Sequence, residues 1–181
     1  GGRGRIGPIE VIFPYIKKNL NLIVCDADPT LKNASLEQNF LEEYKPQVLP
    51  YCVSDNSGLN SFHIMRDPAA SSLHEMDVTC ADWVMPDGRK WREACESTRT
   101  IIVKTSTIDG MHKLGTIPPL DILSLDAQGA EFGILQEAKG MLRDSLLMVL
   151  MEVVFYPLYE HQELYQQCTN FLTNYSFTPV M

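Results

Sequence analysis

The chain has 181 residues, of which 45% are hydrophobic and 21% charged, a balance typical of a globular domain that excludes global disorder. Lysine and arginine number 15 against 23 aspartates and glutamates, so the formal net charge is −8 and a nucleic-acid partner is disfavoured. No apolar run is long enough to cross a bilayer, so we expect no membrane partner either.

Strand-like and helix-like patterns alternate along the chain. In chain order, apolar runs predict strands at 21–25, 47–53, 59–65, 99–105, 121–125, 146–155 and 177–180, and helical spacing predicts helices over 31–44, 131–142 and 162–172, with 66–98 as a long loop region. Apolar strands between helices indicate a parallel sheet covered on both faces. The predicted fold class is therefore α/β, a Rossmann-like doubly wound, mostly parallel sheet in one domain over 1–181.

Five cysteines are present, in an odd number and without a C-x-x-C pair. This pattern argues against a disulfide framework and predicts reduced thiols in a cytoplasmic protein.

The N-terminal segment contains the pattern G-x-G-x-x-G, formed by Gly2, Gly4 and Gly7, and Asp26 follows Gly7 by 19 residues. Glycines allow a cofactor to approach the backbone closely, and an acid after the next strand can bind ribose hydroxyls. A flexible chain end would show the same glycines. The strand that should precede them is missing from the sequence, so we expect truncation at the N-terminus, with a closing strand also missing at the C-terminus.

Several blocks, in order, resemble the FkbM-type S-adenosylmethionine-dependent methyltransferases. The most specific block is 119–131, with the sequence PLDILSLDAQGAE; the others are 1–4, 25–29, 53–58, 70–73, 107–109 and 154–159. The family more often has glutamate where Asp26 stands. The resemblance implies the class I methyltransferase fold and methyl transfer to a hydroxyl of a sugar, polyketide or similar small-molecule or glycan acceptor.

The resemblance also implies roles for individual residues. Gly2 and Gly4 would flank the methionine part of S-adenosyl-L-methionine. The remaining cofactor positions are Asp26 and Ala27 at the ribose, Ser54 and Asp55 beside the adenine, and Asp126 and Gln128 at the transfer site.

The candidate catalytic residues are Asp126, Glu152 and His74. Asp126 ends a predicted strand and is the first candidate for the general base that takes the acceptor proton, although it also suits a turn cap. Glu152 interrupts an apolar run, so it either lines the site or bonds a neighbour, while His74 follows the 71–73 loop and can line the acceptor site. Glu131 is interpreted as a first-turn helix acid rather than a base.

No metal site is predicted, because the four histidines lack metal-ligand spacing. Trp83 and Trp91 either shape an acceptor cleft or pack under the long loop, and Tyr156 and Tyr159 either touch the acceptor or cap the core. The sequence leaves the oligomeric state open, a homo-oligomer included.

Three other functions share parts of this pattern. An NAD(P)-dependent oxidoreductase would use the same glycines and acid, but the chain lacks a Tyr-x-x-x-Lys pair. A glycosyltransferase would use the D-x-D formed by Asp26 and Asp28 to hold a metal, but few basic residues lie nearby to bind phosphate. A catalytically idle Rossmann-like binding module is the third alternative.

Overall fold

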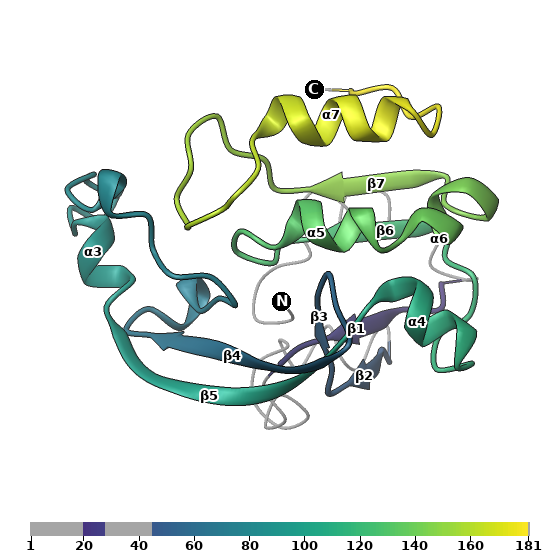
Figure 1. The fold of residues 1–181 in the computed structure, drawn as a ribbon, viewed down its shortest axis with the longest axis horizontal. Coiled ribbons are helices and arrows are strands. Elements are labelled where there is room, and N and C mark those ends of the chain that lie inside the picture. Colours follow the sequence, from purple (N-terminus) through teal and green to yellow (C-terminus); the bar gives the residue numbers. More distant parts are fainter. Residues whose placement is uncertain (1–19, 28–44, 181) are drawn as a thin grey trace.

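The computed structural model describes residues 20–27 and 45–180, which form an α/β structure (Figure 1). Two parallel pairs are present: β1 (Ile23–Cys25) pairs with β2 (Gln47–Leu49), and β6 (Ile122–Leu125) pairs with β7 (Met148–Met151). A third sheet has the order β3-β5-β4, in which β3 (Cys52–Val53) runs parallel and β4 (Gly58–Met65) antiparallel to the long β5 (Ser97–Ser106). The α/β class is thus confirmed. The described strands form three small sheets, and the single doubly wound sheet stays a prediction.

Five α-helices lie within the described residues. They are α3 (Trp91–Ala94), α4 (Ile108–Lys113), α5 (Glu131–Gln136), α6 (Lys139–Asp144) and α7 (Tyr165–Thr173). The region between β4 and β5, predicted as a loop, contains α3 and short 3-10 turns at Pro68–Ala70 and Val78–Cys80, and is irregular between them. In the part of the chain that the structure describes, no helix combines the length and apolar character needed to cross a bilayer.

The elements from both ends of the described chain share one hydrophobic core. Its fully buried members come mainly from α4, β6, α5 and α6, and partly buried residues of β1, β2, β7 and α7 pack against them. An edge-to-face contact of Phe132 with Phe171, at 5.6 Å between ring centroids, joins α5 to α7. One core therefore fixes the two parallel strand pairs relative to the helices.

The predicted strand over 47–53 is two strands. Pro50 has no N–H to donate, and the N–H of Tyr51 donates back to the carbonyl oxygen of Leu49 at 2.9 Å, so the chain turns there. As a result β2 pairs with β1, while β3 pairs with β5.

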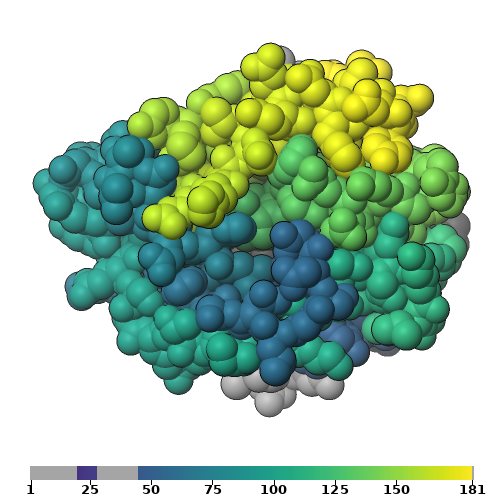
Figure 2. Space-filling view, in the orientation of Figure 1, coloured from purple at the N-terminus to yellow at the C-terminus, as the bar shows by residue number. Residues whose placement is uncertain are grey.

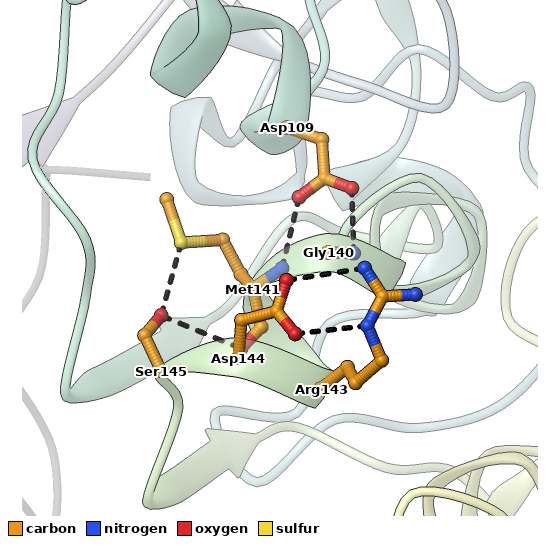
Figure 3. A network of polar contacts seen from close by, with 6 residues as sticks. All are labelled: Asp109, Gly140, Met141, Arg143, Asp144 and Ser145. Atoms are coloured by element: carbon orange, nitrogen blue, oxygen red, sulfur yellow. Dashed lines mark hydrogen bonds and ion pairs between the residues drawn. The ribbon is translucent and has the colours of Figure 1, made fainter.

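The predicted helix over 131–142 is also divided, into α5 and α6. The N–H of Glu137 is shared between the carbonyl oxygens of Gly133 and Ile134, and Ala138 donates to Leu135, so the last turn of α5 tightens and ends. Asp109, from α4, then caps the new helix by accepting from the N–H groups of Gly140 at 2.7 Å and Met141 at 3.1 Å (Figure 3).

Three further boundaries differ from the sequence prediction. The strand predicted over 146–155 is limited to β7, and Phe155 beyond it is 75% exposed in a loop. The helix predicted from 162 begins at Tyr165. No strand forms over 177–180, where Phe177 instead packs against the core. The helix predicted over 31–44 lies outside the described residues.

The long-range cap of α6 yields a stability prediction. Replacing Asp109 with alanine removes both acceptors from the first turn of α6, and we expect the free energy of unfolding to fall by about 1–3 kcal/mol in urea titration. The matched control is Asp144→Ala, which removes an exposed ion pair with Arg143 on the same helix and should leave the unfolding midpoint unchanged. Equal midpoints for the two variants would contradict the capping role.

Candidate functional site

Three carboxylates gather at the carboxyl ends of β6 and β7. The parallel register pairs Leu125 with Met151, and the N–H of Glu152 donates to the carbonyl oxygen of Leu125 at 3.0 Å, so Asp126 and Glu152 leave the sheet side by side. Glu131, the first residue of α5, completes the group, and one oxygen from each carboxylate lies within 4.8 Å of the others. The sequence analysis treated these acids separately, and the strand register brings them together.

Glu131 is the structural member of this group. It is 5% exposed, and its carboxylate accepts from the N–H groups of Ala127 at 2.6 Å and Gly129 at 3.0 Å. Burial is the main cause that raises its pKa; these two donors oppose the rise and the charge of Asp126 adds to it. Because the side chain faces inward onto the loop, it is suited to hold the loop and not to contact a substrate.

The loop from Asp126 to Ala130 is held in an unusual backbone conformation. Gln128 has a φ of 51° and Gly129 a φ of 100°, both in the left-handed region. A Cβ on Gly129 would also lie 3.0 Å from the Cβ of Tyr159, so this position needs glycine on two counts.

Side chains from distant segments fix Gln128 within this loop. The side-chain amide of Gln128 donates to the Asp126 carboxylate at 2.5 Å. The main-chain carbonyl oxygen of Gln128 accepts from the Ser72 hydroxyl at 2.5 Å. The Tyr159 hydroxyl lies 2.9 Å from the Gln128 side-chain oxygen and 3.0 Å from the carbonyl oxygen of Ala70. Asp126 therefore projects from a loop that two distant segments, around Ser72 and Tyr159, hold in position.

A cleft of about 600 Å³ lies beside this loop, between α5 and β4. Figure 2 shows the segments that carry its walls meeting on one face of the molecule. The lining residues are Ser54, Asp55, Asn56, Asn60, Ser61, Leu73, His74, Gly129, Ala130, Phe132, Gly133, Gln136, His161 and Glu163. Gly129 and Ala130 connect the cleft to the loop that carries Asp126.

The predicted adenine residues form one wall of the cleft. Ser54 is 3% exposed, and its hydroxyl donates to the exposed carboxylate of Asp55 at 2.9 Å. Helix α5 approaches this wall closely, because a Cβ on Gly133 would lie 2.9 Å from the Cβ of Asp55. The absence of a side chain at Gly133 thus allows Asp55 and α5 to share the cleft.

His74 lines the same cleft and is half-buried. Burial lowers its pKa, the negative charge of Asp55 opposes this shift, and the nearby His161 and His63 add to it. The imidazole is therefore neutral at physiological pH and has a nitrogen that can accept a proton.

The remaining predicted residues lie apart from the cleft lining or outside the described residues. Asp26 and Ala27 are half-buried directly after β1, and the N–H of Asp26 donates to Leu49 at 3.3 Å, so this acid also ends a parallel strand pair. Gly2 and Gly4 lie outside the described residues. The structure thus brings Ser54, Asp55 and His74 together in the cleft, and Asp126, Gln128 and Glu152 at its neighbouring loop.

The sequence did not predict the roles of several residues of this region. Ser72 lies in the 70–73 block and Tyr159 was left between acceptor contact and a core cap, whereas both are fully buried and position the loop. His161 and Glu163 line the cleft, although the sequence placed the first before a helix and the second within it. Burial raises the pKa of the free thiols Cys25 and Cys52 to about 11, which excludes them as thiolate nucleophiles.

The two tryptophans do not line the cleft. Trp91 packs edge-on against Tyr159 at 5.9 Å and donates from its indole nitrogen to the carbonyl oxygen of Leu158. Trp83 stacks against Tyr156 at 4.9 Å between ring centroids. Packing under the loop is thus the observed role of Trp91, and Tyr159 serves the core and the loop together.

Comparison with known families gives one match. The profile described as the methyltransferase FkbM domain matches residues 15–179, which include every described strand and helix. No curated protein and no solved structure matches the chain at a significant level. The similarity therefore covers the cleft and the carboxylates together.

The acidic cluster makes stability depend on pH. Partial burial of its carboxyl, and then the charges of Asp126 and Glu131, raise the pKa of Glu152, although the residue as a whole is exposed. The folded protein thus binds the Glu152 proton more tightly than the unfolded chain does. The contribution of Glu152 to the free energy of unfolding therefore falls as pH rises above the ordinary carboxyl pKa. In Glu152→Gln the melting temperature should exceed that of the wild type by a margin that grows with pH.

Thermal denaturation from about pH 4 to about pH 8 measures this margin. The matched control is Glu160→Gln, an exposed glutamate outside the cluster, which should follow the wild-type profile. A constant difference between Glu152→Gln and the wild type across this range would contradict the electrostatic coupling.

Proposed function

We propose that this chain, which belongs to the FkbM methyltransferase family, transfers a methyl group from S-adenosyl-L-methionine to a hydroxyl oxygen of a small-molecule or glycan acceptor. The observation that carries the proposal beyond the family is the set of carboxylates Asp126, Glu131 and Glu152 beside the cleft. Bound S-adenosyl-L-methionine supplies a methyl group activated by a positive sulfonium, and a negative site suits that charge.

The residues present fit this cofactor. Asp26 and Ala27 follow a parallel strand pair, where a carboxylate can accept from both ribose hydroxyls. Ser54 and Asp55 would lie by the adenine, and Asp55 can accept from an exocyclic amine. Asp126 and Gln128 would face the transfer site. We further propose that the pairs β1–β2 and β6–β7 belong to one Rossmann-like sheet, with the cofactor across its carboxyl edge.

Transfer to a hydroxyl requires that its proton be removed. As the acceptor oxygen bonds the methyl carbon and the carbon–sulfur bond breaks, the hydroxyl proton passes to a base and S-adenosylhomocysteine is the second product. Asp126 is the first candidate, because the Gln128 amide holds its carboxylate and its loop continues into the cleft lining at Gly129 and Ala130. The neutral imidazole of His74 and the Glu152 carboxylate, whose raised pKa strengthens it as a base, are the alternatives.

Charge disfavours the other cofactors that the sequence left open. Both NAD and a nucleotide sugar carry a pyrophosphate, whose negative charge is bound by backbone N–H groups at a helix N-terminus, by basic side chains or by a metal. Among the described residues that line the cleft, none is lysine or arginine, whereas Asp55 and Glu163 carry negative charge.

The cofactor assignment predicts one ligand preference. S-adenosylhomocysteine should raise the melting temperature, while NAD and a UDP-sugar with manganese should not. In titration calorimetry, Asp26→Ala should bind S-adenosylhomocysteine about tenfold to a hundredfold more weakly, since charge-assisted hydrogen bonds to the ribose are lost. Asp121→Ala, an exposed aspartate before β6, is the matched control and should bind like the wild type. Stabilisation by NAD alone would refute the proposal.

The base assignment predicts a separation of turnover from binding. Asp126→Asn keeps an oxygen for the Gln128 amide but removes the basic carboxylate. We expect the rate of methyl transfer to a panel of hydroxylated glycosides and polyketide-like acids to fall about 10²–10⁴-fold, with affinity for S-adenosylhomocysteine nearly unchanged. If Asp126→Asn turns over like the wild type and His74→Gln does not, the base is His74 and the assignment of Asp126 is wrong.

A further inference from the structure

The side-chain amide of Gln128 lies between the Asp126 carboxylate and the Tyr159 hydroxyl. Its Nε2 donates to Asp126 at 2.5 Å, and its Oε1 lies 2.9 Å from the Tyr159 hydroxyl oxygen. The Ser72 hydroxyl holds the main-chain carbonyl oxygen of Gln128, whose φ of 51° lies in the left-handed region. Because the backbone is held in this way, the amide changes its hydrogen bonds by rotating about the last torsion of its side chain, which has a broad, two-fold preference.

The Tyr159 hydroxyl has too few protons for its neighbours. It has one proton, yet two oxygens lie within donor distance, Gln128 Oε1 at 2.9 Å and the carbonyl oxygen of Ala70 at 3.0 Å. Both oxygens are acceptors only. Burial raises the pKa of Tyr159, which is 1% exposed, so the proton stays on the hydroxyl. One proton therefore serves two acceptors around a buried hydroxyl, where an acceptor without a full donor costs free energy.

A half-turn of the amide supplies the missing donor. In the rotated amide, Nε2 donates to the Tyr159 oxygen, so the Tyr159 proton goes to Ala70 alone. Oε1 then faces Asp126, and because an ionised carboxylate has no proton to donate, the two oxygens repel each other. When Asp126 carries a proton, its O–H donates to Oε1, and the amide and the phenol are both fully bonded. The observed arrangement therefore suits the carboxylate, and the rotated one suits the acid.

We propose that Gln128 and Tyr159 are positioning residues for the base, through an amide that rotates when Asp126 takes a proton. This role rests on the proposed function, in which Asp126 is the first candidate for the base. As the acceptor oxygen bonds the methyl carbon and the carbon–sulfur bond breaks, the hydroxyl proton passes to Asp126, and every other proton stays on its own atom. The rotation then adds one hydrogen bond, which stabilises the protonated acid formed in this step.

Other titratable groups surround this relay of three side chains. Within the described ranges, Glu131 of α5 and Glu152 after β7 share the acidic cluster with Asp126. The Cys95 thiol is hydrogen-bonded to the Tyr159 hydroxyl, and burial raises the pKa of this thiol, so it stays uncharged near neutral pH. The variants below leave Glu131, Glu152 and Cys95 in place, so their effects are common to every comparison.

The rotation is tested first in the wild-type protein without cofactor or acceptor. In isotope-labelled protein, nuclear Overhauser contacts report which group the Nε2 protons of Gln128 approach, and the loss of these signals in Gln128→Asn assigns them. At about pH 7 we expect contacts to the β-protons of Asp126. As the pH falls to about 3, contacts to the ring of Tyr159 should replace them, because the acid then donates to Oε1.

The kinetic test removes the hydroxyl and keeps the ring, in Tyr159→Phe. The matched control Tyr175→Phe removes a hydroxyl from another tyrosine that packs against the core. With the best acceptor from the panel of hydroxylated glycosides and polyketide-like acids, kcat should fall about fivefold to tenfold in Tyr159→Phe alone, with KM and S-adenosylhomocysteine affinity unchanged. In the Gln128→Asn background, where the shorter side chain no longer bridges the two groups, Tyr159→Phe should have no further effect.

The outcomes separate the relay from the proposed function. If the Nε2 contacts stay the same across this pH range, the relay is wrong even in an active enzyme. A rise in KM with unchanged kcat in Tyr159→Phe, or an effect that adds fully to that of Gln128→Asn, also overturns it, since Tyr159 then supports only the fold. If the amide rotates but no hydroxylated acceptor is methylated, the proposed function fails and the rotation stands without a base to serve.

Discussion

The parallel pairing of β6 with β7 is the constraint on which the candidate site depends. It extends by one hydrogen bond beyond the strands, from the N–H of Glu152 to Leu125, and so fixes Asp126 and Glu152 as neighbours. Two carboxylates at this distance repel each other, and the buried Glu131 adds a third charge. The fold therefore maintains a locally unfavourable concentration of acidic groups at one sheet edge, which suits the cationic methyl donor proposed for it.

The cost of this arrangement is offset by the hydrogen bonds of the adjoining loop. Glu131 is buried, but two backbone N–H groups satisfy its carboxylate, and these same bonds hold the loop against α5. Ser72 and Tyr159 hold Gln128 from the other side. Because rigid support reduces the ordering needed when a ligand binds, the loop can present Asp126 in one position before any ligand arrives.

Much of this organisation was predictable because it is local. Apolar runs located β1, β6 and β7 and most of β4 and β5, and the block from 119 to 131 identified the family that the profile match confirms. The errors arose where a single residue or a distant partner decides the outcome. Pro50 divides one apolar run into two strands of different sheets, and Asp109, 31 residues before Gly140, caps a helix that periodicity alone would join to α5.

The candidate site shows the same division between local and distant information. Strand ends are visible in the sequence, so Asp126 and Asp55 were found there, and Glu152 was found as an acid within an apolar run. The proximity of Asp126 to Glu152 follows from register. The cleft is formed by α5, β4 and the segments around 74 and 161, and no pattern within one segment reports that β4 lies at a sheet edge. Sheet order depends on the whole chain. Strand β4 is an edge because β5 pairs with it on one side and with β3 on the other. Chemistry carried by single residues was therefore predictable here, whereas the cleft that several segments form together became visible only with the topology.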